Sequence, residues 1–281
     1  MAVAGRPNVG KSTLVNALCG RKVAIVSDKP QTTRRRLRGI VNGEGYQLVL
    51  VDLPGFQRPR DPLTEHMQRT VDHELEDVDA VLFVLDGTEP SGAGDRFIAA
   101  RVFSLGVPVV IALNKVDRLD PAPIAERISE AAHLGDFHAL HPVSARTGDG
   151  VDALRAELVG LLPDGPLYFP RDQSTDEPLE RQIAEVIREQ ALALTREELP
   201  HAISVDVEEM DECGVRAVLY VETASQRQIV IGKGGRMIKE IGSRARPEIE
   251  TLSGRQIFLE LQVKVRARWR RDERMLERLG I

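Results

Sequence analysis

The sequence predicts two domains, a doubly wound, mostly parallel α/β sheet followed by a smaller α+β domain. Three observations predict this arrangement. The first 160 residues alternate short apolar runs with amphipathic segments, a proline-rich stretch follows, and the rest of the chain differs in element order and charge. The chain has 281 residues, and at about 150 residues per domain this length also fits two domains. We expect the first domain at 1–163, a linker at 164–178 and the second domain at 179–281.

Five short apolar runs in the first domain are bounded by turn residues and rich in β-branched side chains, as buried parallel strands are. They are 1–4, 47–51, 80–85, 107–113 and 139–143. Amphipathic segments predict helices at 12–18, 64–76, 95–104, 124–134 and 151–161. Strand and helix repeated in this order predict a sheet with helices on both faces.

Residues 163–178 contain four prolines together with Gly, Asp and Ser, which disfavours both helix and strand and predicts a linker. A long amphipathic helix is expected at 179–198, with Ile183, Val186, Ile187 and Leu194 near one face. Strands are expected at 203–208, 216–223 and 256–265, with two helices before the last strand and a charged helix after it.

Composition and charge narrow the class of protein. Hydrophobic residues make up 42% of the chain, enough for a sizeable core, and the two cysteines, Cys19 and Cys213, are too few for a disulfide framework. We therefore expect a cytoplasmic protein with neither a signal peptide nor a membrane span. The net charge is −5, but residues 224–281 carry 14 Lys and Arg against seven Asp and Glu. This basic end predicts a polyanion site there.

A phosphate-binding loop is predicted at the end of the first strand. Residues 5–12 read GRPNVGKS and fit G-x-x-x-x-G-K-[ST] between a strand and a helix. In such a loop, backbone N–H groups surround the phosphates at a helix N-terminus. We expect Lys11 to reach the β- and γ-phosphates and Ser12 to ligate Mg²⁺. The predicted phosphate-binding residues are Gly5, Asn8, Val9, Gly10, Lys11, Ser12 and Thr13.

Residues 114–117 read NKVD, follow a predicted strand and favour guanine over adenine. Asp117 can accept hydrogen bonds from N1–H and the exocyclic amine of guanine, whereas adenine has an acceptor at N1 and no amine beside it. Sites of this kind discriminate by about 10⁴-fold or more. The expected guanine site consists of Asn114 as a brace, Lys115 over the base, Asp117, and the backbone of Ser144, Ala145 and Arg146.

Two further loops are expected to sense the γ-phosphate. Asp52, Leu53, Pro54 and Gly55 follow a strand, so that Asp52 would hold Mg²⁺ through water and the Gly55 N–H would face the γ-phosphate. In the loop 31–36, QTTRRR, a threonine should complete the Mg²⁺ shell. Thr33 is preferred because it directly precedes the arginine run, and Thr32 is the alternative. The arginine run itself fits a solvated loop equally well.

The residue after Gly55 is Phe56, where many switch GTPases carry a water-orienting glutamine; Gln57 lies one place late. The order of five motifs resembles that of the translation-factor-like GTPases: residues 5–12, 31–36, 52–55, 114–117 and 144–146. With Phe56 in place of the glutamine, the chain is similar to the subgroup that carries a hydrophobic residue there. Some of these GTPases rely on K⁺, coordinated by an asparagine at the place of Asn8. The resemblance therefore implies K⁺ as a candidate second cation beside Mg²⁺.

The second domain contains a G-x-x-G turn between two apolar helical segments, in the frame VIGKGGRMI. Such a turn lets the backbone of single-stranded RNA approach closely, and KH domains use it to clamp about four nucleotides. A strand after the GxxG helices resembles the type II KH arrangement. The predicted RNA-binding residues are Ile231, Gly232, Lys233, Gly234, Gly235, Arg236 and Lys239.

A P-loop GTPase domain joined to a type II KH domain resembles the Era family of bacterial ribosome-assembly GTPases. The resemblance covers essentially the whole chain and includes the QTTR and DLPGF motifs, residues 167–170 and residues 269–274. It implies GTP and GDP as ligands, slow GTP hydrolysis, and binding to the 3′ end of small-subunit ribosomal RNA in a 30S precursor. It also implies a monomer in the cytoplasm, with peripheral association at the inner membrane as an addition.

Two other functions compete with this interpretation. In the first, the nucleotide domain binds without hydrolysing and the protein only binds RNA; the presence of Lys11, Ser12 and Asp52 argues against it. In the second, the GTPase acts on membrane or cell-division partners and the KH fold contacts protein. RNA crosslinking at Lys233 would separate the second alternative from the expected function.

Overall fold

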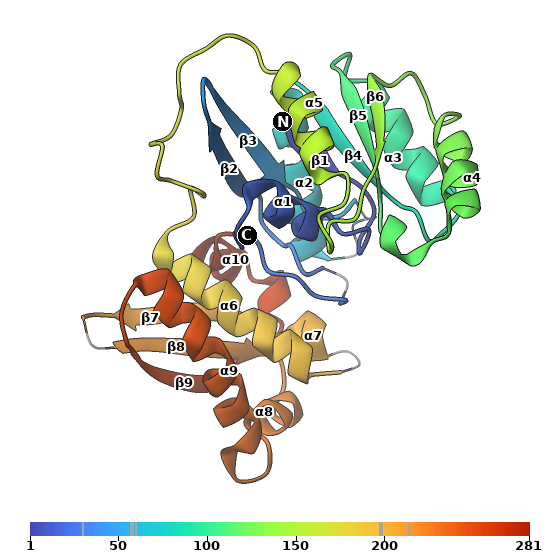
Figure 1. Ribbon diagram of the computed structural model, residues 1–281. Coiled ribbons are helices and arrows are strands. Elements are labelled where there is room, and N and C mark those ends of the chain that lie inside the picture. Colours follow the sequence, from blue (N-terminus) through green and yellow to red (C-terminus); the bar gives the residue numbers. More distant parts are fainter. Residues whose placement is uncertain (30, 57–58, 60, 197–198, 213) are drawn as a thin grey trace. The chain divides into compact units, whose positions relative to one another are not determined.

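The computed structural model describes residues 1–281 except 30, 57–58, 60, 197–198 and 213. It divides into two compact units (Figure 1). The first contains residues 1–26, 33–59 and 67–176, and the second contains 27–32, 60–66 and 177–281. Part of the predicted linker thus belongs to the first unit, and two short segments from the N-terminal half belong to the second.

The first unit is built on a six-stranded sheet in the order β2-β3-β1-β4-β5-β6. All neighbouring strands are parallel except β2 and β3, which form an antiparallel hairpin. The strands are β1 (Ala2–Ala4), β2 (Leu37–Gly43), β3 (Tyr46–Asp52), β4 (Val81–Asp86), β5 (Val109–Asn114) and β6 (Ala139–Pro142). The mostly parallel sheet expected from the sequence is confirmed, but β2 was not predicted.

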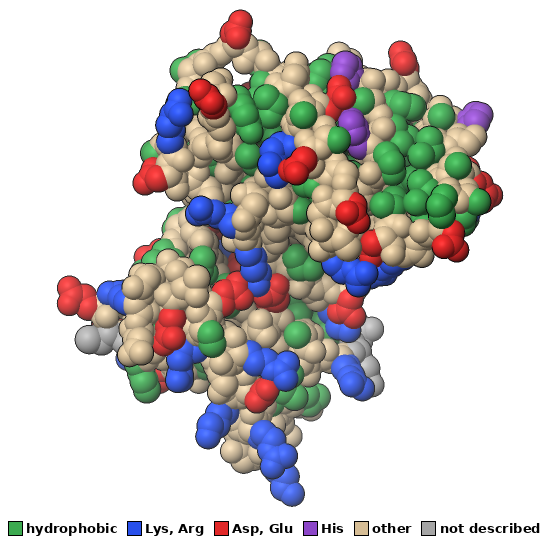
Figure 2. Space-filling view, viewed as in Figure 1, with side chains coloured by type: hydrophobic (Ala, Val, Ile, Leu, Met, Phe, Trp, Pro, Cys, Tyr) green, Lys and Arg blue, Asp and Glu red, His purple; other side chains and the backbone are tan. Residues whose placement is uncertain are grey.

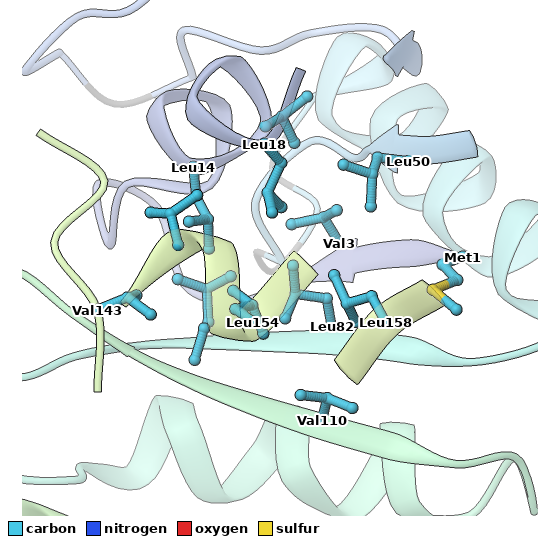
Figure 3. Packing of buried hydrophobic residues seen from close by; sticks show 14 of the residues in the cluster. Met1, Val3, Leu14, Leu18, Leu50, Leu82, Val110, Val143, Leu154 and Leu158 are labelled. Carbon is cyan, nitrogen blue, oxygen red and sulfur yellow. The ribbon is translucent and has the colours of Figure 1, made fainter. Parts of the chain in front are cut away.

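Helices cover both faces of this sheet because its central strands are apolar on both sides. Along β4, Leu82 and Val84 pack in a cluster with α1 (Lys11–Cys19) and α5 (Val151–Gly160). Figure 3 shows this cluster, with Leu14 and Leu18 of α1 and Leu154 and Leu158 of α5 facing the strands. The alternate residues of β4 pack on the other side against α2 (Pro62–Glu76), α3 (Ala93–Phe103) and α4 (Pro121–Ala131).

The strand β2 lies at the edge of the sheet, and the predicted linker runs along its outer side. The Ile40 N–H donates to the Ser174 carbonyl over 2.8 Å, and Gly39 forms an isolated bridge with Thr175. The Asn42 amide donates to the Gln173 carbonyl over 3.0 Å. Since an unpaired strand edge exposes N–H and C=O groups, these bonds satisfy part of the edge.

The second unit is built on a three-stranded sheet in the order β7-β8-β9. Strand β7 (Ser204–Met210) is antiparallel to β8 (Gly214–Val221), and β9 (Phe258–Val265) is parallel to β8. The helices α6 (Leu179–Leu194), α8 (Ala224–Ile231) and α9 (Arg236–Ser253) supply side chains to one hydrophobic core with these strands. The order helix, strand, strand, helix, helix, strand is the type II KH arrangement expected from the sequence.

The end of the chain is anchored to this second unit. After β9, the short helix η3 (Trp269–Arg271) carries a fully buried tryptophan, whose Nε1–H donates to the Ala202 carbonyl over 2.8 Å. The last helix, α10 (Glu273–Leu279), contacts β7 through Arg278, whose Nε lies 2.7 Å from Asp206 Oδ2. Across the described residues, no helix has the length and apolarity needed to span a membrane.

Candidate nucleotide and RNA sites

The phosphate-binding loop joins β1 to α1, and Gly10 is the last residue before the helix. Gly10 has φ 97°, and a Cβ there would lie 2.3 Å from the amide nitrogen of Asn114. That amide donates to the Val9 carbonyl over 2.9 Å. Glycine is therefore required for both the left-handed backbone and the close approach of Asn114.

Lys11 lies in the hollow of this loop and is 7% exposed. Its ammonium donates to the carbonyls of Gly5 and Arg6, over 3.1 and 3.0 Å. Burial lowers the Lys11 pKa to about 8, and the nearby Asp52 carboxylate acts in the opposite direction. The ammonium occupies the concave side of the loop, where P-loop proteins bind phosphate oxygens.

Three side-chain oxygens meet beside Lys11, from the start of α1, the end of β3 and the loop before β2. Ser12 Oγ donates to Asp52 Oδ2 over 2.6 Å, and Thr33 Oγ1 lies 3.1 Å from Ser12 Oγ and 3.5 Å from Asp52 Oδ2. The Thr32 hydroxyl instead donates to the Lys29 carbonyl over 2.6 Å. Of the two candidate threonines, Thr33 is the one that the structure brings to this group.

The group of oxygens fits a hard divalent cation. Asp52 is fully buried, and its Oδ1 has no hydrogen-bond donor among the residues that the structure describes. Burial raises the pKa of the Asp52 carboxyl, while Lys11, Ser12 and Thr33 act to lower it. A buried carboxylate oxygen without a donor is costly unless a cation compensates it. Hydroxyl and carboxylate oxygens are ligands that Mg²⁺ prefers.

The predicted guanine-binding residues also meet. Asp117 accepts from Ser144 Oγ over 2.7 Å and from the Arg146 guanidinium over 2.5 Å. The hydrogen bond from Ser144 and the charge and hydrogen bond of Arg146 all lower the pKa of the Asp117 carboxyl. Asn114 Oδ1 accepts from the Ala145 N–H over 3.0 Å, so this one amide contacts both the phosphate loop and the 144–146 segment.

The segment after Asp52 lies against the phosphate loop. A Cβ placed on Gly55 would be 3.0–3.2 Å from three atoms of Pro7, so the two backbones nearly touch. Leu53 and Pro54 are buried. Phe56 is only 6% exposed and belongs to the core on the α2–α3 side of the sheet. Gln57 lies outside the described residues.

The arginine run after Thr33 is not a fully solvated loop. Arg34 is 4% exposed. The Arg36 guanidinium pairs with Glu74 of α2, and Arg38 donates to Asp176 over 2.9 Å. These contacts hold the beginning of β2 against α2 and against the end of the predicted linker.

Sequence reasoning missed two acidic partners of the nucleotide site. Arg6 of the phosphate loop donates to Asp95 of α3 over 2.7 Å, and Asp95 is 1% exposed. Asp86, the last residue of β4, accepts from the Lys115 ammonium over 2.5 Å. No motif surrounds Asp86 or Asp95, and nothing in the sequence indicates that either carboxylate meets its partner.

The GxxG turn joins α8 to α9, with Gly235 as the residue before α9. Lys233, Arg236 and Lys239 are exposed, and none of them has an acidic partner among the described residues. Arg236 and Lys239 are three residues apart on α9 and therefore lie on the same face. Figure 2 shows Lys and Arg side chains gathered where α8 and α9 meet in Figure 1.

Comparisons with known proteins identify the two kinds of domain. Residues 1–115 match the family described as 50S ribosome-binding GTPase, and residues 198–270 match the KH domain family. A crystal structure of Era in complex with MgGDPNP and nucleotides 1506–1542 of 16S ribosomal RNA is 37% identical, with a TM-score of 0.93. The comparison covers 99% of this chain and 97% of that one.

A second solved structure, an Aquifex aeolicus Era variant bound to GDP and AlF₄⁻, is 38% identical with a TM-score of 0.95 over the same shares of both chains. Fold, site and similarity together define a P-loop GTPase with a C-terminal KH domain. The chain belongs to the Era family, and the resemblance seen in its sequence is confirmed.

Proposed function

We propose that this GTPase is a Mg²⁺-dependent switch that binds the 3′ end of small-subunit ribosomal RNA and acts in assembly of the 30S subunit. The observation that carries the nucleotide part is the meeting of Ser12, Thr33 and Asp52 oxygens beside Lys11. Ser12 and Thr33 would ligate Mg²⁺ directly and Asp52 would hold it through water. When bound, Mg²⁺ neutralises charge that develops on the β- and γ-phosphates.

Guanine selectivity is assigned to Asp117. Its carboxylate would accept from N1–H and the exocyclic amine, while the Lys115 stem covers the base and Asn114 braces the loop. In the structure, the guanidinium of Arg146 donates to Oδ2 of the Asp117 carboxylate. Because guanine offers a similar pair of N–H donors, Arg146 has to move aside when the base binds, while Ser144 continues to orient Asp117.

We propose that this chain promotes hydrolysis by positioning the phosphates and not by a side chain that acts as a base. Lys11 would hold the β- and γ-phosphates, and the N–H of Gly55 would contact the γ-phosphate. Phe56 packs in the core and cannot orient the attacking water. Turnover of the isolated protein should therefore be slow. We propose K⁺ near Asn8 as the second cation that assists this step.

RNA binding is assigned to the GxxG turn. The backbone of Gly232, Gly234 and Gly235 would admit phosphates closely, while Lys233, Arg236 and Lys239 supply positive charge. These three exposed cations have no acidic partner in the described part of the chain. They would displace the counterions that surround a polyanion, and the release of those counterions favours binding. Ile231, which packs partly against the core, would lie under the bound bases.

The nucleotide and RNA sites are proposed to be coupled. Residues 27–32, just before Thr33, belong to the same compact unit as the KH elements. A change of this segment on γ-phosphate binding would therefore reach the RNA-binding unit. We propose that the protein works as a monomer in the cytoplasm on a 30S precursor, and that any association with the inner membrane is peripheral.

Crosslinking in cells, followed by sequencing of the attached RNA, tests the proposed function. Reads should accumulate at the 3′ end of small-subunit ribosomal RNA, and the variant with Lys233→Asp and Gly234→Asp should lose them. Reads spread evenly over cellular RNA, or equal yields from parent and variant, would contradict the assignment. The parallel GTP-binding measurement on both proteins separates loss of RNA binding from loss of the nucleotide site.

A further inference from the structure

Lys115 bridges two segments that are far apart in the sequence. Its ammonium donates to the Asn8 carbonyl of the phosphate loop over 2.8 Å and to Asp86 Oδ2 over 2.5 Å. The Asp86 side chain is 9% exposed and that of Lys115 is 21% exposed. Lys115 also has a left-handed backbone, φ 69°, which is costly for a residue with a Cβ and needs support from its surroundings.

The carboxylate of Asp86 is held in place from the other side. Its Oδ1 accepts from the N–H and the hydroxyl of Thr88, over 3.0 and 2.6 Å. Asp86 pairs in register with Asn114 across β4 and β5, and the Gly87 N–H donates to the Asn114 carbonyl over 2.8 Å. The end of β4 therefore presents one fixed oxygen to Lys115.

We infer that Asp86 is a positioning residue of the nucleotide site, which acts through Lys115 to fix the guanine-reading loop against the phosphate loop. The Asn8 carbonyl alone offers a neutral acceptor, whereas the Asp86 carboxylate adds a charge-assisted hydrogen bond that directs the ammonium. With the ammonium fixed at both acceptors, the Lys115 stem is held across the space between the two loops. The base site and the phosphate site then keep one separation before nucleotide arrives, which reduces the ordering cost of binding.

The electrostatics agree with this geometry. Burial acts to raise the pKa of the Asp86 carboxyl, but the hydrogen bonds from Lys115 and Thr88 outweigh it and the pKa lies below its usual value. Asp86 is therefore charged at neutral pH and attracts the ammonium. The inference rests on the proposed guanine-nucleotide site, because Lys115 has this role only if nucleotide binds there.

A double-mutant cycle on the full chain tests the role. GDP dissociation is measured for the parent, Asp86→Asn, Lys115→Met and the double variant. Asp86→Asn keeps an oxygen for Thr88 but loses the charge, so GDP should dissociate about tenfold faster. In the Lys115→Met background the same substitution should change the rate less than about twofold, because its effect passes through the ammonium.

Two controls separate this role from general stability. Asp136→Asn removes an exposed carboxylate from the same unit and should leave GDP dissociation unchanged. Thr88→Ala loosens the turn after β4 and leaves the carboxylate charged, so it should have a smaller effect than Asp86→Asn. If Asp86→Asn lowers Tm, Asp86→Ser, which retains an oxygen for Thr88, provides the same comparison.

Several outcomes would overturn the inference. They are an unchanged GDP dissociation rate in Asp86→Asn, the same acceleration with and without Lys115, or an equal effect of Thr88→Ala. GDP binding by the parent is measured in the same series. If the parent itself did not bind GDP, the proposed nucleotide site would fail, and this failure is distinct from the three outcomes above.

Discussion

Ser12 Oγ and Asp52 Oδ2 lie 2.6 Å apart although the two residues are separated by 40 positions in the sequence. Ser12 is the second residue of α1, the helix after β1, and Asp52 ends β3, which pairs with β1 in parallel. Parallel strands end at the same edge of a sheet, so residues that follow them meet there. Thr33 joins the pair from the loop before β2.

The two neighbouring threonines provide a matched test of the metal site. Thr33→Val should lower GTP hydrolysis about a hundredfold, because the transition state loses one preorganised cation ligand. Thr32→Val should leave it nearly unchanged, since the Thr32 hydroxyl donates to the Lys29 carbonyl and not to Ser12 or Asp52. Hydrolysis is measured at saturating GTP and Mg²⁺. A larger loss with Thr32→Val would reverse the assignment.

Asp117→Asn should exchange guanine for xanthine as the preferred base. The amide can donate to the additional carbonyl of xanthine, whereas guanine loses a charged acceptor. The ratio of guanine to xanthine affinity should change by about 10⁴-fold, as in other sites that select a substrate through buried hydrogen bonds. Competition between GDP and xanthosine diphosphate measures it. Asp120→Asn, an exposed carboxylate before α4, is the control. Unchanged guanine preference in Asp117→Asn would mean that another residue selects the base.

Hydrolysis by the isolated protein should be slow, about 10⁻⁴–10⁻² s⁻¹, as for GTPases without an activating partner. Phe56 belongs to the core and offers no polar group to water. Phosphate release at saturating GTP measures the rate. Turnover above about 1 s⁻¹ would indicate a catalytic group elsewhere in the chain.

Replacing Na⁺ with K⁺ at constant ionic strength should accelerate hydrolysis if Asn8 helps to bind a monovalent cation. Asn8→Ala should abolish the acceleration by K⁺, because the side-chain amide oxygen of Asn8 is the proposed ligand of this cation. Equal rates of the parent in Na⁺ and K⁺ would remove K⁺ from the mechanism.

RNA affinity should differ between the GTP and GDP states, since residues 27–32 belong to the unit that carries the KH elements. By thermodynamic linkage, RNA must change the ratio of GTP to GDP affinity by the same factor. Such coupling factors are typically about 5- to 150-fold. Titrations of RNA into GDPNP-bound, GDP-bound and nucleotide-free protein measure it. Identical affinities in all three would describe two independent modules.

Lys233→Asp combined with Gly234→Asp should lower RNA affinity at low salt. Gly234 has φ 62°, a backbone that aspartate tolerates, and a Cβ there meets nothing within 4 Å, so the fold should survive. The variant places negative charge where phosphates approach, and the remaining affinity should depend less on salt. GTP affinity should not change, because the phosphate loop lies in the other unit.

The matched control for this variant is Arg21→Asp with Gly106→Asp. It makes the same change in charge, and Gly106 also has positive φ, 71°, with open space at its Cβ. Both residues are exposed in the first unit. This control should bind RNA like the parent. Equal loss in both variants would indicate that net charge, and not the GxxG turn, determines affinity.

The sequence alone determined the fold class and the two kinds of site. The P-loop, NKVD and GxxG motifs are local, because each depends on a few consecutive residues at the end of a strand or between two helices. Apolar runs likewise predicted most of the strands and helices, since burial on both faces of a parallel sheet requires continuous hydrophobic segments. The strand β2 was missed because its sequence, LRGIVNG, contains two glycines, an arginine and an asparagine. The segment becomes a strand through its pairing with β3 and with residues 174–175.

Only the tertiary structure decided which side chains meet. It selected Thr33 over Thr32 beside Ser12 and Asp52, and it placed Phe56 in the core. It also paired Asp86 with Lys115 across 29 positions of sequence. The physical reason is that a carboxylate or a hydroxyl carries no local preference for a distant partner. Such contacts arise when the order of strands in the sheet brings their ends together.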